Sequence, residues 1–163
     1  VEVPLIDDAG VDGERSFVVE LAEVTGGAEL GRAATTVVIE DDDLLPGPCV
    51  ESEAVLCLRD GRFRVEIEWR DFEDRRGIGS AERLTSESGF FWFFREDNLE
   101  VVVKVLDACS AFDRFWVFAA GLTNVEARLT VVDTATGTVR TYDNDLGSVF
   151  QPVQDVDAFA TCP

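Results

Sequence analysis

The chain has 163 residues, with 33 Asp and Glu against 14 Lys and Arg, so its formal net charge is −19. This acidic balance argues against nucleic acid as a partner, because phosphate binding needs a basic stripe. The absence of histidine excludes Ser-His-Asp and Cys-His nucleophiles and every His-ligated metal. Hydrophobic residues make up 46% of the chain, which is too many for an acidic disordered tail, and no stretch is apolar for long enough to span a membrane. We therefore expect a folded, secreted protein that is not an enzyme.

Residues 1–43 are predicted to form three short strands separated by acidic loops. The strands are expected at 1–6, 16–24 and 33–40, which are rich in β-branched residues or alternate apolar and polar positions. The segment holds 12 acidic and two basic residues, and it is too short to bury a core of its own. A linker over 44–48 follows, in which Pro46-Gly47-Pro48 prevents regular structure.

Residues 49–163 are predicted to form a separate antiparallel β-sandwich. The seven expected strands lie at 54–59, 62–69, 90–94, 99–106, 115–120, 125–133 and 138–142. Residues 62–69 alternate between apolar and charged side chains, which is typical of a strand with one buried and one solvent-facing side. Asp60-Gly61 and Thr134-Ala135-Thr136-Gly137 are predicted hairpin turns, and no useful length of sequence has a helical period. The predicted fold class is all-β.

Four cysteines form an even set in this small chain: Cys49, Cys57, Cys109 and Cys162. There is no CxxC pair and no histidine to complete a zinc site, so two disulfides in an oxidising compartment are predicted. The alternative is four inert, buried thiols in a cytosolic protein. Four cysteines allow three pairings, and counting them does not select one.

The run Phe90-Phe91-Trp92-Phe93-Phe94 is the most unusual stretch of the chain. On a strand, Phe90, Trp92 and Phe94 point to one side, and the other two rings point to the opposite side. One set must lie in the core. We expect loops to cover the second set, so that both sides are core, and the alternative is an exposed platform that stacks on sugar rings.

Three kinds of polar feature are further candidate sites. Lys104, the only lysine, is predicted on the solvent-facing side of its strand, and the alternative pairs it with Glu100 or Asp107. Asn98-Leu99-Glu100 and Asp143-Asn144-Asp145 are predicted to be Asx turns, and the alternative is a second Ca²⁺ site. Pairs of carboxylates do not indicate a glycosidase here, because some pair among 33 acids always stands at a plausible distance.

The first segment resembles the closing half of a Calx-beta domain. The motifs are Val3-Pro4-Leu5-Ile6-Asp7-Asp8, Ser16-Phe17, Glu20-Leu21, Gly26-Gly27-Ala28, Leu30-Gly31 and Thr36-Val37-Val38-Ile39-Glu40-Asp41-Asp42-Asp43. The resemblance covers about a quarter of the chain and implies an immunoglobulin-like β-sandwich of extracellular and exchanger proteins. The family's first strands are missing and the chain contains no methionine, so we expect a piece of a longer secreted protein.

Several members of that family bind Ca²⁺ at one end of the sandwich. The resemblance implies that the ligands would come from two acidic groups: Asp7, Asp8 and Asp12, and then Asp41, Asp42 and Asp43. Ca²⁺ takes six to eight oxygens, and the family's remaining ligands belong to the missing half. The alternative is a solvated acidic face that carries no cation.

The second segment resembles a module of bacterial secreted multidomain proteins that often lies beside Calx-beta and other adhesive repeats. The motifs include Leu56-Cys57-Leu58, the aromatic run 90–94, Val103-Lys104-Val105-Leu106-Asp107, Phe115-Trp116-Val117-Phe118 and Leu122-Thr123-Asn124-Val125-Glu126. The resemblance implies an extracellular location and this architecture, without an activity. It also implies the disulfide pairs Cys49–Cys57 and Cys109–Cys162.

Together these features predict a non-catalytic extracellular module with a structural or adhesive role. Its orphan N-terminal strands would pair with other protein chains, including copies of itself, and a repeated head-to-tail contact would build a filament. Ca²⁺ is the cofactor that the Calx-beta resemblance implies. The alternative function is a glycan-binding module that uses Phe90, Trp92 and Phe94 as its platform.

Overall fold

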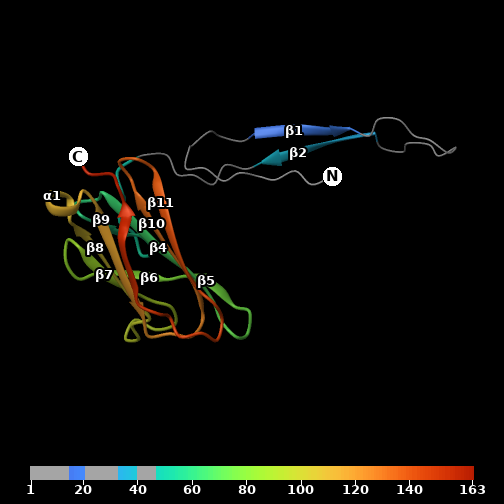
Figure 1. The fold of residues 1–163 in the computed structure, drawn as a ribbon. Helices are drawn as coiled ribbons and strands as arrows, with labels where there is room; N and C mark the ends of the chain where they lie inside the picture. Colours follow the sequence, from blue (N-terminus) through green and yellow to red (C-terminus); the bar gives the residue numbers. More distant parts are fainter. Residues whose placement is uncertain (1–14, 21–32, 40–46) are drawn as a thin grey trace. The chain divides into compact units, whose positions relative to one another are not determined.

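The computed structural model describes residues 15–20, 33–39 and 47–163 (Figure 1). The described part of the chain is all-β, as predicted, with antiparallel sheets and a single short helix. The chain divides into two compact units, Val1–Leu45 and Pro46–Pro163, and the division falls inside the predicted linker.

The described residues of the first unit form one antiparallel hairpin. Its strands are β1 (Arg15–Glu20) and β2 (Ala34–Ile39), with Arg15 opposite Ile39 and Glu20 opposite Ala34. Val18 is 57% exposed and Val38 is 51% exposed. A two-stranded ribbon alone is only marginally stable in water. Burial of its exposed valines against a partner would stabilise the ribbon. The predicted strand over 1–6 lies outside the described residues.

The second unit packs two five-stranded antiparallel sheets face to face (Figure 1). One sheet has the order β11-β10-β4-β3, with β5 also paired to β4. Its strands are β3 (Leu56–Leu58), β4 (Phe63–Arg70), β5 (Arg76–Ile78), β10 (Glu126–Asp133) and β11 (Thr138–Asn144). The other sheet has the order β12-β9-β8-β7-β6. Its strands are β6 (Ser80–Arg83), β7 (Ser88–Trp92), β8 (Val101–Asp107), β9 (Phe115–Gly121) and β12 (Val153–Phe159).

All seven predicted strands of this unit are present, within a few residues of their predicted ends. Both predicted turns are also found. The N–H of Arg62 donates to the carbonyl of Arg59 across Asp60-Gly61, and both central residues have positive φ, as a tight hairpin turn requires. Four elements were not predicted: β5, β6, β12 and the helix α1 (Cys109–Phe112).

The core lies between the two sheets and is built from the inward side chains of alternating positions. Phe63 is fully buried at its centre, with the ring of Phe115 at 5.0 Å and that of Phe159 at 5.2 Å. Phe91 and Ile67 are also fully buried. Alternation thus leaves one side chain in two on the outer face of each sheet, where the two sheets differ sharply in chemistry.

Gly89 on β7 gives a test of how closely the two sheets approach. A Cβ at this position would lie 2.6 Å from the carbonyl oxygen of Glu82 and 2.5 Å from Leu56. Replacing Gly89 by alanine is therefore expected to lower the free energy of unfolding by about 1–3 kcal/mol. Urea denaturation measures the loss, with Ser88→Ala on the same strand as the control. Equal stability of the two variants would contradict this packing.

Both disulfides lie in the second unit. Cys49 is bonded to Cys57 and Cys109 to Cys162, with Cα–Cα distances of 5.7 and 5.6 Å, so all four cysteines are oxidised. These are the pairs that the resemblance implies, and the alternative of four free thiols is not met. The bonds are compatible with an extracellular or secreted protein. None of the described helices is long and apolar enough to cross a membrane.

A buried ion pair holds the C-terminal segment against the sheet that contains β4 and β10. The carboxylate of Asp133 is fully buried and accepts hydrogen bonds from the Arg62 guanidinium, at 3.1 and 3.3 Å, and from the Thr161 hydroxyl. Arg62 also donates to the Thr161 carbonyl and lies 4.3 Å from the centre of the Phe115 ring. One carboxylate thus joins β4, β10 and the residues beside Cys162.

Candidate functional site

The outer face of the sheet β12-β9-β8-β7-β6 is apolar across its three central strands. Its side chains come from β7, β8, β9 and α1, and we call this surface the aromatic face: Phe90, Trp92, Val102, Leu106, Phe112, Trp116 and Phe118. Phe90 lies opposite Val102, and Leu106 lies opposite Trp116. The strand residues of this set are half-buried, and Phe112 of α1 is 61% exposed. Apart from Lys104 on β8 and Ser88 on β7, the outward side chains of these strands are therefore apolar.

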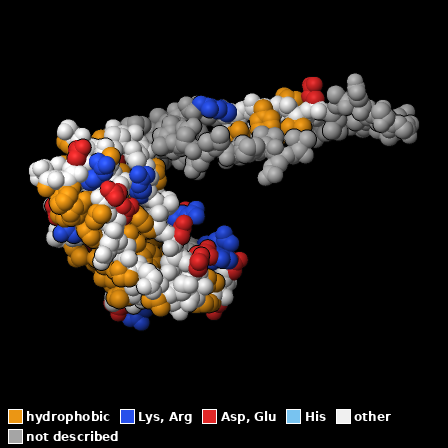
Figure 2. Space-filling view, viewed as in Figure 1, with side chains coloured by type: hydrophobic (Ala, Val, Ile, Leu, Met, Phe, Trp, Pro, Cys, Tyr) orange, Lys and Arg blue, Asp and Glu red, His pale blue; other side chains and the backbone are white. Residues whose placement is uncertain are grey.

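Three rings of this face, those of Phe112, Trp116 and Phe118, are packed in sequence against one another. Phe112 lies 4.8 Å from Trp116, and Trp116 lies 6.2 Å from Phe118 in an edge-to-face arrangement. Figure 2 shows hydrophobic side chains gathered along the left side of the second unit, where Figure 1 places β7, β8 and β9. Contiguous apolar patches of this kind mark interaction surfaces on soluble proteins.

The structure separates the three residues of the predicted platform. Phe90 and Trp92 lie on the aromatic face, while Phe91 and Phe93 are in the core, as the alternation predicts. The expectation that loops bury the second set is not met, because Phe90 and Trp92 keep part of their surface exposed. Phe94 follows the end of β7, and its ring packs 4.9 Å from Trp69 of the other sheet. It is therefore not part of this face.

Lys104 is the charged residue at the middle of the aromatic face. Its side chain is 47% exposed and lies 3.8 Å from a carboxylate oxygen of Glu87. Ser88 and Phe118 are its neighbours on the adjacent strands. The prediction of a solvent-facing lysine is confirmed, and the alternative pairing with Glu100 or Asp107 is wrong. A single lysine beside a glutamate leaves the face nearly neutral.

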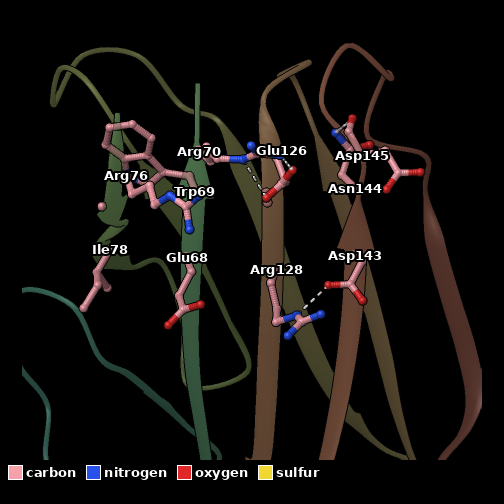
Figure 3. Close-up of a pocket in the computed structure, with 12 residues that line it drawn as sticks. Glu68, Trp69, Arg70, Arg76, Ile78, Glu126, Arg128, Asp143, Asn144 and Asp145 are labelled. Atoms are coloured by element: carbon pink, nitrogen blue, oxygen red, sulfur yellow. Dashed lines mark hydrogen bonds and ion pairs between the residues drawn. The ribbon is translucent and has the colours of Figure 1, made fainter. Parts of the chain in front are cut away.

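The outer face of the other sheet has the opposite character. A groove of about 610 Å³ runs along β4, β5, β10 and β11 (Figure 3). Most of its lining side chains are charged: Glu68, Arg70, Arg76, Glu126, Arg128, Asp143 and Asp145. Arg70 donates twice to Glu126, and Arg128 lies 2.7 Å from Asp143 (Figure 3). The groove is therefore a solvated surface held together by ion pairs.

The pairing in this groove does not favour acid–base catalysis. The hydrogen bond from Arg70 lowers the pKa of the Glu126 carboxyl below its ordinary value, although partial burial opposes the shift. A general acid at neutral pH needs the opposite, a raised pKa. Glu126 is thus suited to hold β4 against β10 and not to donate a proton.

The same shift predicts a dependence of stability on pH. A lowered pKa in the folded state means that the Arg70–Glu126 pair stabilises the fold above the unfolded pKa and ceases to do so as pH falls through the folded pKa. The stability difference between wild type and Glu126→Gln is expected to be present at pH 7, to decrease once pH falls below the unfolded pKa of about 4.3, and to vanish only below the lower pKa of the folded state. Urea denaturation across this pH range measures it. A difference that persists unchanged in acid would contradict the role of this pair.

The predicted Ca²⁺ ligands Asp7, Asp8, Asp12, Asp41, Asp42 and Asp43 lie outside the described residues. Over 15–20, 33–39 and 47–163, no group of three or more acidic or cysteine side chains is arranged to hold a metal ion. Asp143 and Asn144 belong to β11, so the predicted Asx turn over 143–145 is not found. The buried amide of Asn144 instead donates to the carbonyls of Val125 and Ser148 and so organises the loops around it.

The comparisons with known proteins found no match. No protein-family model matches the chain, and no curated protein or solved structure is significantly similar to it. The aromatic face and the paired groove are therefore interpreted from their own geometry. Of the two, the aromatic face has the apolar composition that is typical of interaction surfaces.

Proposed function

We propose that the protein is a non-catalytic extracellular structural or adhesive module, which assembles with protein chains through its aromatic face. The observation that carries the proposal is the contrast between the two outer faces of one sandwich. One is lined by ion pairs, as a solvated sheet requires, and the other presents aromatic rings on β7 and β9, with Val102 and Leu106 of β8 between them. Burying such a face against another chain removes apolar area from water, which is the main driving force of association.

Copies of the chain itself are the partners that we propose. The chain carries a second apolar surface on the β1–β2 hairpin, where the register places Val18 (57% exposed) and Val38 (51% exposed) on the same face. Two different surfaces on one chain make a head-to-tail contact, which builds an open filament when its rotation does not close. The formal charge of −19 keeps the subunits soluble and makes their assembly depend on salt.

The Calx-beta resemblance belongs to the same proposal. In it, residues 1–43 supply the closing strands of an immunoglobulin-like domain, and Ca²⁺ binds the acidic ends once a partner completes the site. The two disulfides support an extracellular setting. Calorimetric titration with Ca²⁺ tests this part, and an absence of heat at millimolar Ca²⁺ would contradict it.

The test of assembly is particle size as a function of concentration. Wild-type protein is expected to grow in mass as concentration rises, while the double variant Trp116→Thr/Phe118→Thr is expected to stay monomeric. Threonine keeps the strand propensity of both positions, so the fold is retained, and circular dichroism verifies this. Glu68→Thr on the outer face of the other sheet is the matched control and should assemble like wild type. A wild type that is monomeric at every concentration would overturn the proposal.

Glycan binding is the second candidate, because a specific observation favours it. Phe90, Trp92, Trp116 and Phe118 present aromatic rings on one flat sheet face, and such rings can stack on the apolar sides of sugars. A glycan array with and without Ca²⁺ tests this candidate. Hits that are lost in Trp92→Thr, together with a monomeric wild type, would favour the glycan over the protein partner.

A further inference from the structure

One buried acid of the sandwich has no cationic partner. Three carboxylates are buried in the described part of the chain, those of Asp71, Glu100 and Asp133, with residue exposures of 5%, 4% and 0%. Asp71 accepts from Arg75 at 2.7 Å, and Asp133 accepts from Arg62. The carboxylate of Glu100 accepts a single hydrogen bond, from the side-chain amide of Asn98, and no described arginine or lysine forms an ion pair with it.

The backbone holds Glu100 in place directly before β8. Its N–H donates to the carbonyl of Phe91 at 2.9 Å, and its own carbonyl accepts from the N–H of Leu122 at 2.7 Å. These bonds tie it to both β7 and the end of β9. The backbone of Glu100 is thus fixed at one end of the sandwich, and the amide of Asn98 is the hydrogen-bond donor to its carboxylate.

Glu100 lines a pocket of about 410 Å³, together with Phe94, Leu122, Thr123, Asn124, Val125 and Val149. The apolar members of the rim are exposed: Leu122 by 79%, Val149 by 64% and Phe94 by 44%. A buried carboxyl group therefore lies next to accessible apolar side chains. Burying a carboxylate without a countercharge is costly, so a cation bound here would offset that cost.

The chemistry of the pocket selects among cations. Ca²⁺ needs six to eight oxygens with several carboxylates, and the pocket contains one carboxylate. A guanidinium binds best to two free carboxylate oxygens, and one oxygen of Glu100 already accepts from Asn98. An ammonium needs one strong acceptor and can share its other protons with neutral oxygens such as those of Asn124. Its alkyl stem would lie along the exposed Leu122 and Val149, with the ring of Phe94 beside it.

The geometry points to a binding site for a primary alkylammonium group, as carried by a lysine side chain of a partner chain or by a small free amine. This site is separate from the aromatic face, and it does not depend on the proposed assembly. Its ligand would approach the end of the sandwich formed by the segment after β7 and the β9–β10 connection.

The test is an NMR titration of ¹⁵N-labelled protein with Nα-acetyl-lysine amide. Saturable shifts are expected at the amides of Glu100, Leu122 and Thr123, and the norleucine and arginine analogues should bind at least about tenfold more weakly. Glu100→Gln keeps an oxygen that accepts from Asn98, so it should fold, and it should lose binding by a similar factor. Shifts that are equal for lysine and norleucine, or unchanged in Glu100→Gln, would overturn the site.

Two further measurements make the outcome specific. A lysine-centred tripeptide that binds more tightly than n-butylammonium identifies a protein lysine as the ligand, whereas equal binding shows that the free amine suffices. Trp116→Thr/Phe118→Thr should bind the lysine analogue like wild type, because the two surfaces are independent. Failure of the aromatic face and failure of this pocket can thus be distinguished.

Discussion

Replacing Asp133 by alanine is expected to lower the free energy of unfolding by about 3–5 kcal/mol, because it removes one partner of a buried ion pair. The Asp133 side chain is fully buried, so the Arg62 guanidinium and the Thr161 hydroxyl would both lose an acceptor that water cannot readily replace. Urea denaturation of the oxidised protein measures the loss.

The matched control is Asp143→Ala, which breaks the Arg128–Asp143 pair on the surface of the same sheet. Both of its side chains are more than half exposed, so the loss should stay below about 1 kcal/mol. Equal losses in the two variants would contradict the role assigned to burial. If Asp133→Ala lowered the free energy of unfolding only slightly, other contacts would have to hold the C-terminal segment.

Removal of the Cys109–Cys162 bond is expected to be the other large effect. The two cysteines are 53 residues apart, and the chain-entropy model assigns the bond about 4 kcal/mol. The Cys49–Cys57 bond spans 8 residues and should contribute about 2.5 kcal/mol in the same model. The two double variants should therefore differ in stability. Cys109→Ser/Cys162→Ser should be less stable than Cys49→Ser/Cys57→Ser.

Denaturant midpoints of the two double variants decide this prediction. A larger loss from the short loop would contradict the loop-length account. The long-range bond also holds α1, which carries Phe112 beside Trp116. Its removal should therefore weaken assembly through the aromatic face as well as stability, whereas removal of the short bond should leave assembly intact.

Most strands could be predicted from the sequence because their alternation is strong. In residues 62–69, apolar and charged positions alternate without exception, and the structure buries the side that the pattern selects. The strand β12 was missed because Asp155 and Asp157 interrupt its apolar positions, and its pairing with β9 is irregular between Asp155 and Phe159. The strands β5 and β6 are too short for a pattern and flank Gly79.

The candidate site could be predicted only in part. The alternation of residues 90–94 separates the core rings from Phe90 and Trp92, but it does not tell whether another layer covers them. The segments of β8 and β9 are apolar on both sides, which is also the pattern of a strand buried on both faces. Only the arrangement of the sheets shows that Trp116 and Phe118 face outward on the same side of the sheet as Phe90, with β8 between them. The unpaired state of Glu100 likewise depends on contacts between distant segments.

The most direct test of the central claim, that the aromatic face is a contact surface between protein chains, is covalent footprinting read by mass spectrometry. Labelling of Phe90, Trp92, Trp116 and Phe118 is expected to fall as protein concentration rises, while exposed Ile78 and Leu84, outside this face, keep their labelling. Labelling of the aromatic face that stays constant while particle mass grows would contradict the claim.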